Sequence, residues 1–285
     1  MRRHDEPIVA HLVDGTYELF RHFYGARRGR QRDPEFAAVR GVLRTVLSML
    51  EDGATHLGVA TDHVIESFRN DLWPGYKTGA GVDPELRAQF EPLEQSLAAM
   101  GVAVWPMVEL EADDALAGAA HVAAGEARVH KVCIWTPDKD LAQCVSGERV
   151  VQVDRRSSTV RDEPGVLEKF GVPPARIPDY LALVGDSADG YPGIPGIGAV
   201  GARGLIRRHG ALEEFPPEVL GSRIDLALLF KHLATLRTEP PPIRLAEELR
   251  WEGPDAAFDD LPEAIADAGL RARLEALAGS RAARP

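Results

Sequence analysis

The chain has 285 residues, of which 45% are hydrophobic, and this is enough to bury one large core or two modest ones. It contains no apolar run of membrane-spanning length, and its N-terminus has no signal-peptide core, so we expect a cytoplasmic protein with no membrane partner. The formal net charge of −11 argues at first against a nucleic-acid partner, but much of the excess belongs to acidic residues that bound metal ions would neutralise.

Strand-like and helix-like patterns alternate through the first part of the chain. The strand-like runs are IVAHLVD ending on Asp14, THLGVATD ending on Asp62, VAVWPM before the ELEADD segment, and KVCIWTPD ending on Asp138. Helical patterns around residues 35–51, 84–100 and 112–125 lie between them. This alternation predicts an α/β fold in which helices cover both faces of a mostly parallel sheet.

The composition changes near Gly171, where the prolines of GVPPARIPDY end the alternation. Beyond this point the pattern is helical and is interrupted by glycines. We therefore expect a first domain over residues 1–172 and a helical second domain over residues 173–285, which ends in a last helix.

Acidic residues fall in five short segments: three follow predicted strands, one opens the helix after the third strand, and one lies in the helical part beyond Gly171. They are Asp14, Asp62, Glu111, Asp113, Asp114, Asp138, Asp140, Asp186 and Asp189. In open α/β sheets the ligand site lies beyond the carboxyl ends of the strands, so these side chains should converge. Two divalent ions such as Mg²⁺ or Mn²⁺ would relieve the repulsion between them. Paired metal ions in an acidic site are typical of enzymes that cleave phosphodiester bonds, so the sequence predicts a metal-dependent nuclease.

Each acidic segment also has a simpler interpretation when it is taken alone. Asp14 and Asp62 could cap the helices that follow their strands. The ELEADD segment could be an acid-rich first helical turn, and TPDKD could be an ordinary strand-to-helix turn. Only the conjunction of all the segments favours a metal site over these alternatives.

The segment GDSADGYPGIPGIG places a tight glycine turn just after Asp186 and Asp189. The helix that follows carries Arg203, Arg207 and Arg208. Such a turn can expose several backbone N–H groups at a helix start, which suits a DNA phosphate.

Two other segments offer cations. SFRNDLWPGYKTG contains Arg69, Tyr76 and Lys77, and cations beside a metal centre can stabilise charge on a scissile phosphate. An early cluster, which could equally be a solvated surface, consists of Arg21, Arg27, Arg28, Arg30 and Arg32.

Together these segments resemble the 5′-to-3′ exonuclease and flap-endonuclease family, and in particular stand-alone relatives of the N-terminal nuclease domain of bacterial DNA polymerase I. The resemblance runs from about residue 8 to about residue 275. It is carried by VDGTYELFR, ATDHVIESFRNDLWPGYK, ELEADDALA, TPDKDLAQ, LVGDSADGYPGIPGIG and HLATLRTEPP.

The resemblance implies a three-layer α/β/α core of the PIN-like or resolvase-like kind, followed by a helix–three-turn–helix domain. It implies hydrolysis of DNA at 5′ ends, flaps or nicks, with two Mg²⁺ or Mn²⁺ ions held by all the acidic residues named above. A helical arch would span about residues 78–95. Further implications are a potassium ion at the glycine turn, cooperation with a DNA polymerase and ligase, a monomeric state and association with the nucleoid.

The resemblance also implies roles for basic and glycine positions. Lys77, Arg69 and Arg21 match positions that contact the phosphates near the cut, as catalytic residues. The expected DNA-binding residues are Tyr76, Gly193, Gly196, Gly198, Arg203 and Arg207.

Three positions depart from the family pattern and bear on DNA affinity. The family usually has a cation where Pro195 stands, Asn where Gly190 stands, and a small hydroxyl residue where Gly201 stands. Two other functions therefore stay open at this point. One is a non-catalytic protein that binds branched DNA on the same fold, and the other is a PIN-type ribonuclease.

Overall fold

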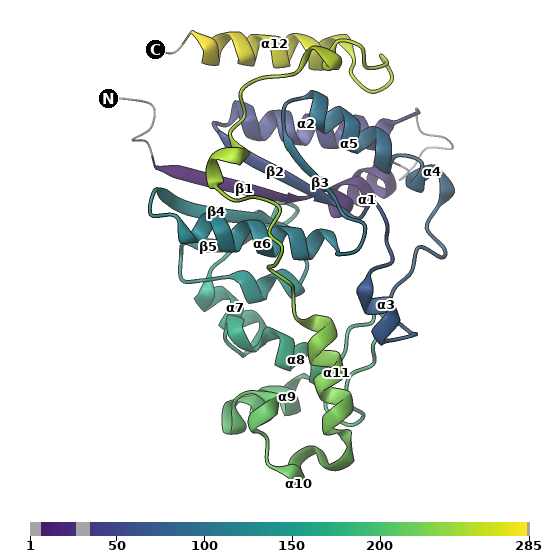
Figure 1. The fold of residues 1–285 in the computed structure, drawn as a ribbon, viewed down its shortest axis with the longest axis vertical. Helices are drawn as coiled ribbons and strands as arrows, with labels where there is room; N and C mark the ends of the chain where they lie inside the picture. Colours follow the sequence, from purple (N-terminus) through teal and green to yellow (C-terminus); the bar gives the residue numbers. More distant parts are fainter. Residues whose placement is uncertain (1–6, 27–34, 284–285) are drawn as a thin grey trace.

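The computed structural model describes residues 7–26 and 35–283, and a single six-stranded sheet lies at the centre of the N-terminal part (Figure 1). The strands are β1 (Ile8–Asp14), β2 (His56–Thr61), β3 (Ala103–Pro106), β4 (Val129–Trp135), β5 (Val150–Asp154) and β6 (Thr159–Arg161). Their spatial order is β3-β2-β1-β4-β5-β6, and all neighbours are parallel except β5 and β6. The strand order reverses between β1 and β4, and ligands of open α/β sheets bind at such a switch point.

Helices cover both faces of this sheet. Helices α1 (Gly15–Ala26), α2 (Ala37–Glu51) and α5 (Phe90–Ala99) share one hydrophobic core with β1 and β2. Helix α6 (Ala112–Gly125) packs on the opposite face, against β1, β2, β4 and β5. Neighbouring residues of β1 point to opposite faces, since Val13 joins the first core and Leu12 the second. The expected three-layer α/β/α arrangement of a mostly parallel sheet is confirmed.

A second, helical part packs below the sheet (Figure 1). Its helices are α7 (Glu163–Phe170), α8 (Ile177–Val184), α9 (Ala199–His209), α10 (Pro217–Leu220) and α11 (Ile224–Ala234). They enclose a separate core in which Phe230 and Leu181 are buried. Short 3-10 turns complete the chain: η2 (Asp140–Cys144), η3 (Pro174–Arg176), η4 (Leu212–Glu214), η5 (Gly221–Arg223), η6 (Ala246–Leu249) and η7 (Ala256–Phe258). Within the described ranges, no helix is both long and apolar enough to cross a membrane.

The chain returns to the first part after α11. Its last helix, α12 (Ala268–Ala282), lies above α2 at the end of the molecule opposite to α10 (Figure 1). Trp251 and Leu274 are buried in the core that contains α2 and α5. Arg273 pairs with Glu51 at the end of α2, at 2.6 Å. The C-terminal segment therefore packs on the sheet domain.

The segment expected to form an arch, residues 78–95, is largely anchored. It contains the short helix α4 (Pro84–Arg87) and the first turns of α5. Leu86 and Phe90 are buried in the same core as α2, so this part is fixed against the sheet domain. An extended stretch connects α4 to α3 (Phe68–Leu72), which lies beside the helical part (Figure 1).

Candidate metal centre and nucleic-acid interface

Asp14 lies at the end of β1, at the switch point of the sheet. One of its carboxylate oxygens accepts a hydrogen bond from the Tyr17 N–H at 2.8 Å, and the other accepts from the Thr136 hydroxyl at 2.9 Å. The glycine after it is required by close packing, because a Cβ on Gly15 would lie 2.7 Å from Val59 and 2.8 Å from the Ala60 carbonyl oxygen. Gly15 thus allows α1 to begin directly against β2, which fixes the orientation of Asp14.

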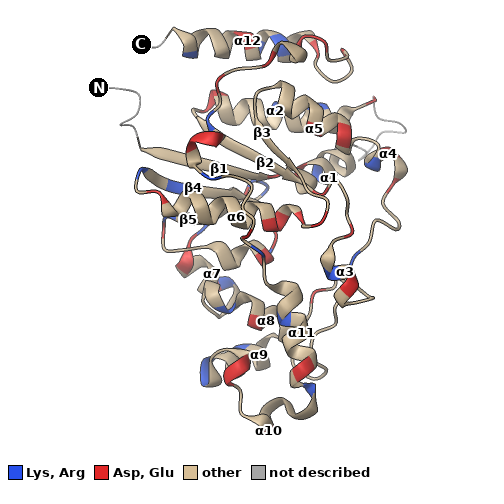
Figure 2. Ribbon diagram, in the orientation of Figure 1, with Lys and Arg blue, Asp and Glu red and all other residues tan. Residues whose placement is uncertain are grey.

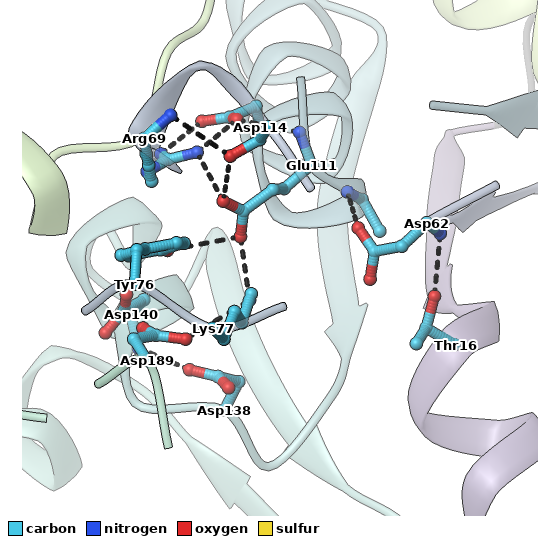
Figure 3. Close-up of polar contacts among 12 residues, drawn as sticks. Thr16, Asp62, Arg69, Tyr76, Lys77, Glu111, Asp114, Asp138, Asp140 and Asp189 are labelled. Atoms are coloured by element: carbon cyan, nitrogen blue, oxygen red, sulfur yellow. Dashed lines mark hydrogen bonds and ion pairs between the residues drawn. The ribbon is translucent and has the colours of Figure 1, made fainter. Parts of the chain in front are cut away.

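Asp62 follows β2 and faces the start of α6. Its carboxylate accepts from the Ala112 N–H at 2.8 Å, and its own N–H donates to the Thr16 hydroxyl at 2.8 Å (Figure 3). Asp113 on α6 is partly buried. Repulsion from the nearby Asp138, Asp14 and Asp62 helps to raise its pKa. Four acidic side chains from β1, β2, α6 and the β4 end therefore meet at this edge of the sheet.

Glu111 is almost fully buried and is surrounded by donors. It accepts from the Ser67 hydroxyl at 2.6 Å and from the Tyr76 hydroxyl at 3.3 Å. The Lys77 ammonium group lies 2.7 Å from Glu111 and 3.2 Å from Asp189, so it bridges the two carboxylates. Burial opposes ionisation of Glu111, but Lys77 and Arg69 outweigh it, and the pKa of Glu111 is lowered.

The Asp114 side chain lies against Arg69, and both of its carboxylate oxygens accept hydrogen bonds (Figure 3). Both of its oxygens accept from the Arg69 guanidinium at 2.8 Å, and they also accept from the N–H groups of Glu111 at 3.0 Å and Arg237 at 2.8 Å. Arg69 is only 1% exposed and donates further bonds to the Leu233 and Thr235 carbonyls. This pair joins α3, α6 and the end of α11, and it leaves Asp114 without a free oxygen.

A second acidic group comprises Asp140, Asp186 and Asp189. One oxygen from each lies within 4.8 Å of the others, and all three residues are buried. The Oδ1 atom of Asp140 has no hydrogen-bond partner. The Lys139 ammonium group pairs with Asp186 at 2.6 Å. A buried carboxylate oxygen without a partner is costly, and a bound cation would satisfy it.

The loop that carries Asp186 and Asp189 is held by close backbone contacts. The N–H of Asp186 donates to the Tyr191 carbonyl at 2.8 Å, and the Tyr191 N–H donates back at 3.0 Å. A side chain on Gly193 would overlap the backbone at Gly185, and both glycines have positive φ. The glycines therefore allow the two ends of the acidic loop to meet.

Burial is the largest cause of the raised pKa values at this site. It raises the pKa of Asp14 to about 7, with Asp62 and Asp138 adding repulsion, and that of Asp189 to about 6. The pKa values of Asp113 and Asp140 are also well above the usual value. The donors are all carboxylates, which hard divalent cations such as Mg²⁺ and Mn²⁺ prefer. The residues therefore fit a divalent-metal centre.

The cations expected near the cut lie in different environments. Lys77 is partly exposed between the two acidic groups, whereas Arg69 is enclosed by Asp114 and Glu111. Arg21 lies two turns into α1, where it pairs with Glu18. The other arginines of the early basic cluster, at positions 27, 28, 30 and 32, fall outside the described residues.

The expected DNA-binding residues also divide into buried and accessible groups. Tyr76 is only 4% exposed and belongs to the helical core. Gly196 and Gly198 border open space in the turn before α9. On α9, Arg207 is exposed and Arg203 is partly buried.

Sequence reasoning missed three polar residues that contact the acidic groups. Lys139 pairs with Asp186, Thr136 donates to Asp14, and the buried Gln152 of β5 donates to the Asp138 carbonyl. Lys139 could have been found, because a cation between two acidic residues of one motif is conspicuous. Gln152 carries no such signal, since its partner is a backbone oxygen.

Family models match almost the entire described chain. The model described as 5′-3′ exonuclease, N-terminal resolvase-like domain, matches residues 9–171. The model described as 5′-3′ exonuclease, C-terminal SAM fold, matches residues 172–257.

Curated relatives include both long and short proteins. DNA polymerase I of Pseudomonas aeruginosa is 34% identical over 254 residues, which cover 82% of this chain and 27% of the relative. The chain therefore spans about a quarter of that polymerase. The 5′-3′ exonuclease of Aquifex aeolicus is 30% identical over 260 residues, which cover 86% of this chain and 87% of the relative.

Solved structures share the fold at low identity. The phage T5 D15 protein co-crystallised with metal ions has a TM-score of 0.70 at 17% identity and covers 94% of this chain and 98% of its own. The catalytic core of Rad2 in complex with DNA substrate has a TM-score of 0.62 at 13% identity and covers 96% of this chain and 93% of its own. With both family domains matched in order over the described fold, the chain belongs to the 5′-3′ exonuclease family.

Proposed function

We propose that this protein is a divalent-metal-dependent 5′-3′ exonuclease and 5′-flap endonuclease that hydrolyses DNA phosphodiester bonds. One observation carries the proposal: Lys77 lies between two groups of carboxylates, and the buried Asp140 keeps an oxygen without a partner. A purely structural role would leave the buried Asp140 oxygen without a partner and close to other carboxylates that repel it, which is costly. Family membership and the metal-containing T5 relative support the same conclusion.

The carboxylates divide into two candidate ion sites. The first would use Asp14, Asp62, Glu111, Asp113 and Asp138, and the second would use Asp140, Asp186 and Asp189. The chemistry that two such ions would supply is activation of a water nucleophile and stabilisation of the leaving oxygen. Asp114 is assigned a positioning role, because its oxygens all accept bonds from Arg69 and from backbone N–H groups.

Lys77 is the residue that we propose to stabilise charge on the scissile phosphate. Its ammonium group is partly exposed and lies between the two candidate ion sites. Burial opposes its charge, but Glu111 and Asp189 hold the pKa of Lys77 well above its usual value, so it is cationic at neutral pH. Arg69 would act by holding Glu111 and Asp114 in position. Arg21 would contact the DNA strand only after its ion pair with Glu18 breaks.

Duplex DNA would bind at the turn between α8 and α9. Gly196 and Gly198 leave space for a phosphate at the start of α9, and Arg207 faces solvent. A potassium ion on the carbonyls of this turn, cooperation with a DNA polymerase and ligase, a monomeric state and a nucleoid location belong to the same proposal. The stretch between α3 and α4 is the proposed path of the 5′ arm.

Cleavage of a 5′-labelled flap substrate tests the function directly. We expect products only when Mg²⁺ or Mn²⁺ is present, with cleavage near the junction of the flap and on nicked duplexes. Asp138→Asn should abolish cleavage while binding of the same flap persists. Turnover by this variant would remove the metal assignment, and a preference for an RNA flap assayed in parallel would favour a ribonuclease instead.

A further inference from the structure

A buried tyrosine hydroxyl lies in the loop of the second acidic group without a hydrogen-bond partner. Tyr191 is only 1% exposed, and its Oη atom contacts no donor or acceptor of residues 7–26 and 35–283. The ring is well packed, since its centre lies 5.5 Å from that of the Phe230 ring. A buried tyrosine hydroxyl usually has a partner, and phenylalanine would fill the same space without an unpaired polar group. Ring packing therefore does not account for the hydroxyl.

The backbone of Tyr191 closes the loop that carries two of the three acidic residues. Its carbonyl accepts from the Asp186 N–H at 2.8 Å, and its N–H donates to the Asp186 carbonyl at 3.0 Å. Asp189 stands two residues earlier in the chain. Figure 2 shows acidic positions where the sheet meets the helical part of the molecule. The backbone pairing thus fixes the point from which the Tyr191 side chain extends relative to Asp186.

The surrounding carboxylates keep the Tyr191 hydroxyl protonated. Burial raises the pKa of this hydroxyl most, and repulsion from Asp140, Asp189 and Asp186 raises it further. Among these carboxylates, Asp140 has the largest effect. The hydroxyl is therefore a neutral hydrogen-bond donor close to several acceptors.

Asp140 has the complementary deficit. Its Oδ1 atom is buried and accepts no hydrogen bond from the part of the chain that the structure describes. A carboxylate offers about four lone-pair positions, so a group that binds a cation can also accept a hydrogen bond. A donor without an acceptor and an acceptor without a donor thus occur at the same acidic group.

We propose that Tyr191 is a positioning residue for the ion site of Asp140, Asp186 and Asp189, and that its hydroxyl supplies the hydrogen-bond donor that Asp140 lacks. This inference rests on the proposed function. One bridging water completes the contact, because a water-mediated hydrogen bond is nearly as favourable as a direct one. Carboxylates that bind metal ions are themselves held by hydrogen bonds, and loss of such a partner typically weakens metal affinity about 10- to 100-fold.

Manganese binding in the absence of DNA tests this role separately from cleavage. Isothermal titration calorimetry with Mn²⁺ would compare the full-length parent, Tyr191→Phe, Asp140→Asn and the double variant. We expect Tyr191→Phe to weaken, by about tenfold, the same binding event that Asp140→Asn weakens. In the Asp140→Asn background, Tyr191→Phe should cause no further loss, because the two groups act through one contact.

Tyr180→Phe is the matched control for a lost tyrosine hydroxyl. Tyr180 is buried in the same helical core, where its ring centre lies 6.1 Å from that of Phe170. Its substitution should leave the Mn²⁺ affinity at the parental value. Thermal unfolding of every variant with a chelator shows whether the metal-free fold is intact, and we expect Tyr191→Phe to melt close to the parent.

The outcomes separate this inference from the proposed function. If the parent binds Mn²⁺ and Tyr191→Phe binds it equally well, Tyr191 does not position the ion site, although the proposed function stands. A lower metal-free melting temperature with parental Mn²⁺ affinity would likewise show a purely structural role. Equal losses for Tyr191→Phe and Tyr180→Phe, or a further loss in the Asp140→Asn background, would also overturn the inference. If the parent itself binds no Mn²⁺, the proposed function fails as well.

Discussion

Gly190 packs directly against the carbonyl group of Gly75, so closely that a Cβ on Gly190 would overlap the Gly75 oxygen. Two hydrogen bonds join the same segments, since the Trp73 indole N–H donates to the Gly190 carbonyl at 3.0 Å and the Lys77 N–H donates to the Asp189 carbonyl at 2.9 Å. The loop that carries Lys77 is thus fastened to the loop that carries Asp189. Where the family usually has Asn, this chain uses a glycine to allow that contact.

Gly190→Ala should therefore displace Lys77 from its position between Glu111 and Asp189. The positive φ of Gly190 alone costs about 1–2 kcal/mol for alanine, and the overlap with Gly75 adds about 1–3 kcal/mol. We expect turnover to fall more than substrate affinity, measured by steady-state kinetics and urea unfolding. Gly53→Ala is the control, because Gly53 also has a positive φ but no neighbour within 4 Å. Equal effects of the two substitutions would show that the overlap is unimportant.

Hydrophobic patterns located β1, β2 and β4, because each is a largely buried apolar run that ends on or a few residues before an acidic residue. β1 ends on Asp14, and α6 covers residues 112–125 as predicted. The helical pattern at 84–100 is broken into α4 and α5. The strands β5 and β6 were not predicted, and only β6 is short and mostly exposed, whereas β5 is a buried five-residue run. The antiparallel edge and the packing of α12 depend on tertiary contacts that local patterns do not contain.

Substitutions of Arg69 and Lys77 should separate effects on stability from effects on catalysis. Arg69→Met leaves the buried carboxylate of Asp114 without its cationic partner, and breaking a buried ion pair in this way costs about 3–5 kcal/mol. Lys77→Met removes a partly exposed cation while Arg69 still neutralises Glu111. We therefore expect a large loss of unfolding free energy only for Arg69→Met, and loss of cleavage with near-parental stability for Lys77→Met. Comparable stability losses in urea would contradict this division.

Asp113 and Asp114 are adjacent in sequence, but replacing each by Asn should change the stability of the folded state in opposite directions. Asp114→Asn weakens the bonds from Arg69 and the Arg237 N–H, so the folded state should lose stability. Asp113 is repelled by Asp138 and Asp14, and burial raises its pKa most, so Asp113→Asn should stabilise the metal-free protein and abolish cleavage. Thermal unfolding and flap cleavage of both variants provide the test. A stabilised Asp114→Asn protein would show that its contacts with Arg69 are dispensable.

The sequence identifies these acidic residues but does not indicate which of them pair with cationic side chains and which keep a free oxygen. Their spacing places Glu111 and Asp114 on one face of α6, which suggests a shared metal site. The structure instead turns Asp114 toward Arg69, a residue brought from α3 by the packing of the helical part. Which carboxylate receives a cationic side chain, and which keeps a free oxygen as Asp140 does, depends on partners distant in sequence.

The stability of the protein should depend on pH and divalent ions together. Burial raises the pKa of Asp14 to about 7 and that of Asp189 to about 6. The folded chain therefore binds more protons than the unfolded chain between about pH 4 and about pH 7, so the free energy of unfolding without metal should fall as pH rises through this window. Divalent ions compete with these protons, and the stabilisation that they provide should grow over the same window.

The Asp140→Asn variant tests whether Asp140 contributes to this competition between protons and divalent ions. It removes a buried charge whose Oδ1 atom has no partner, so the metal-free variant should melt at a higher temperature than the parent at neutral pH. The rise in melting temperature caused by Mg²⁺ or Mn²⁺ should shrink in the same variant. Asp260→Asn, at an exposed position, is the control for a lost negative charge. Scanning calorimetry with chelator or metal gives both quantities, and a metal-induced rise that is equal in parent and Asp140→Asn at every pH would exclude Asp140 from the ion site.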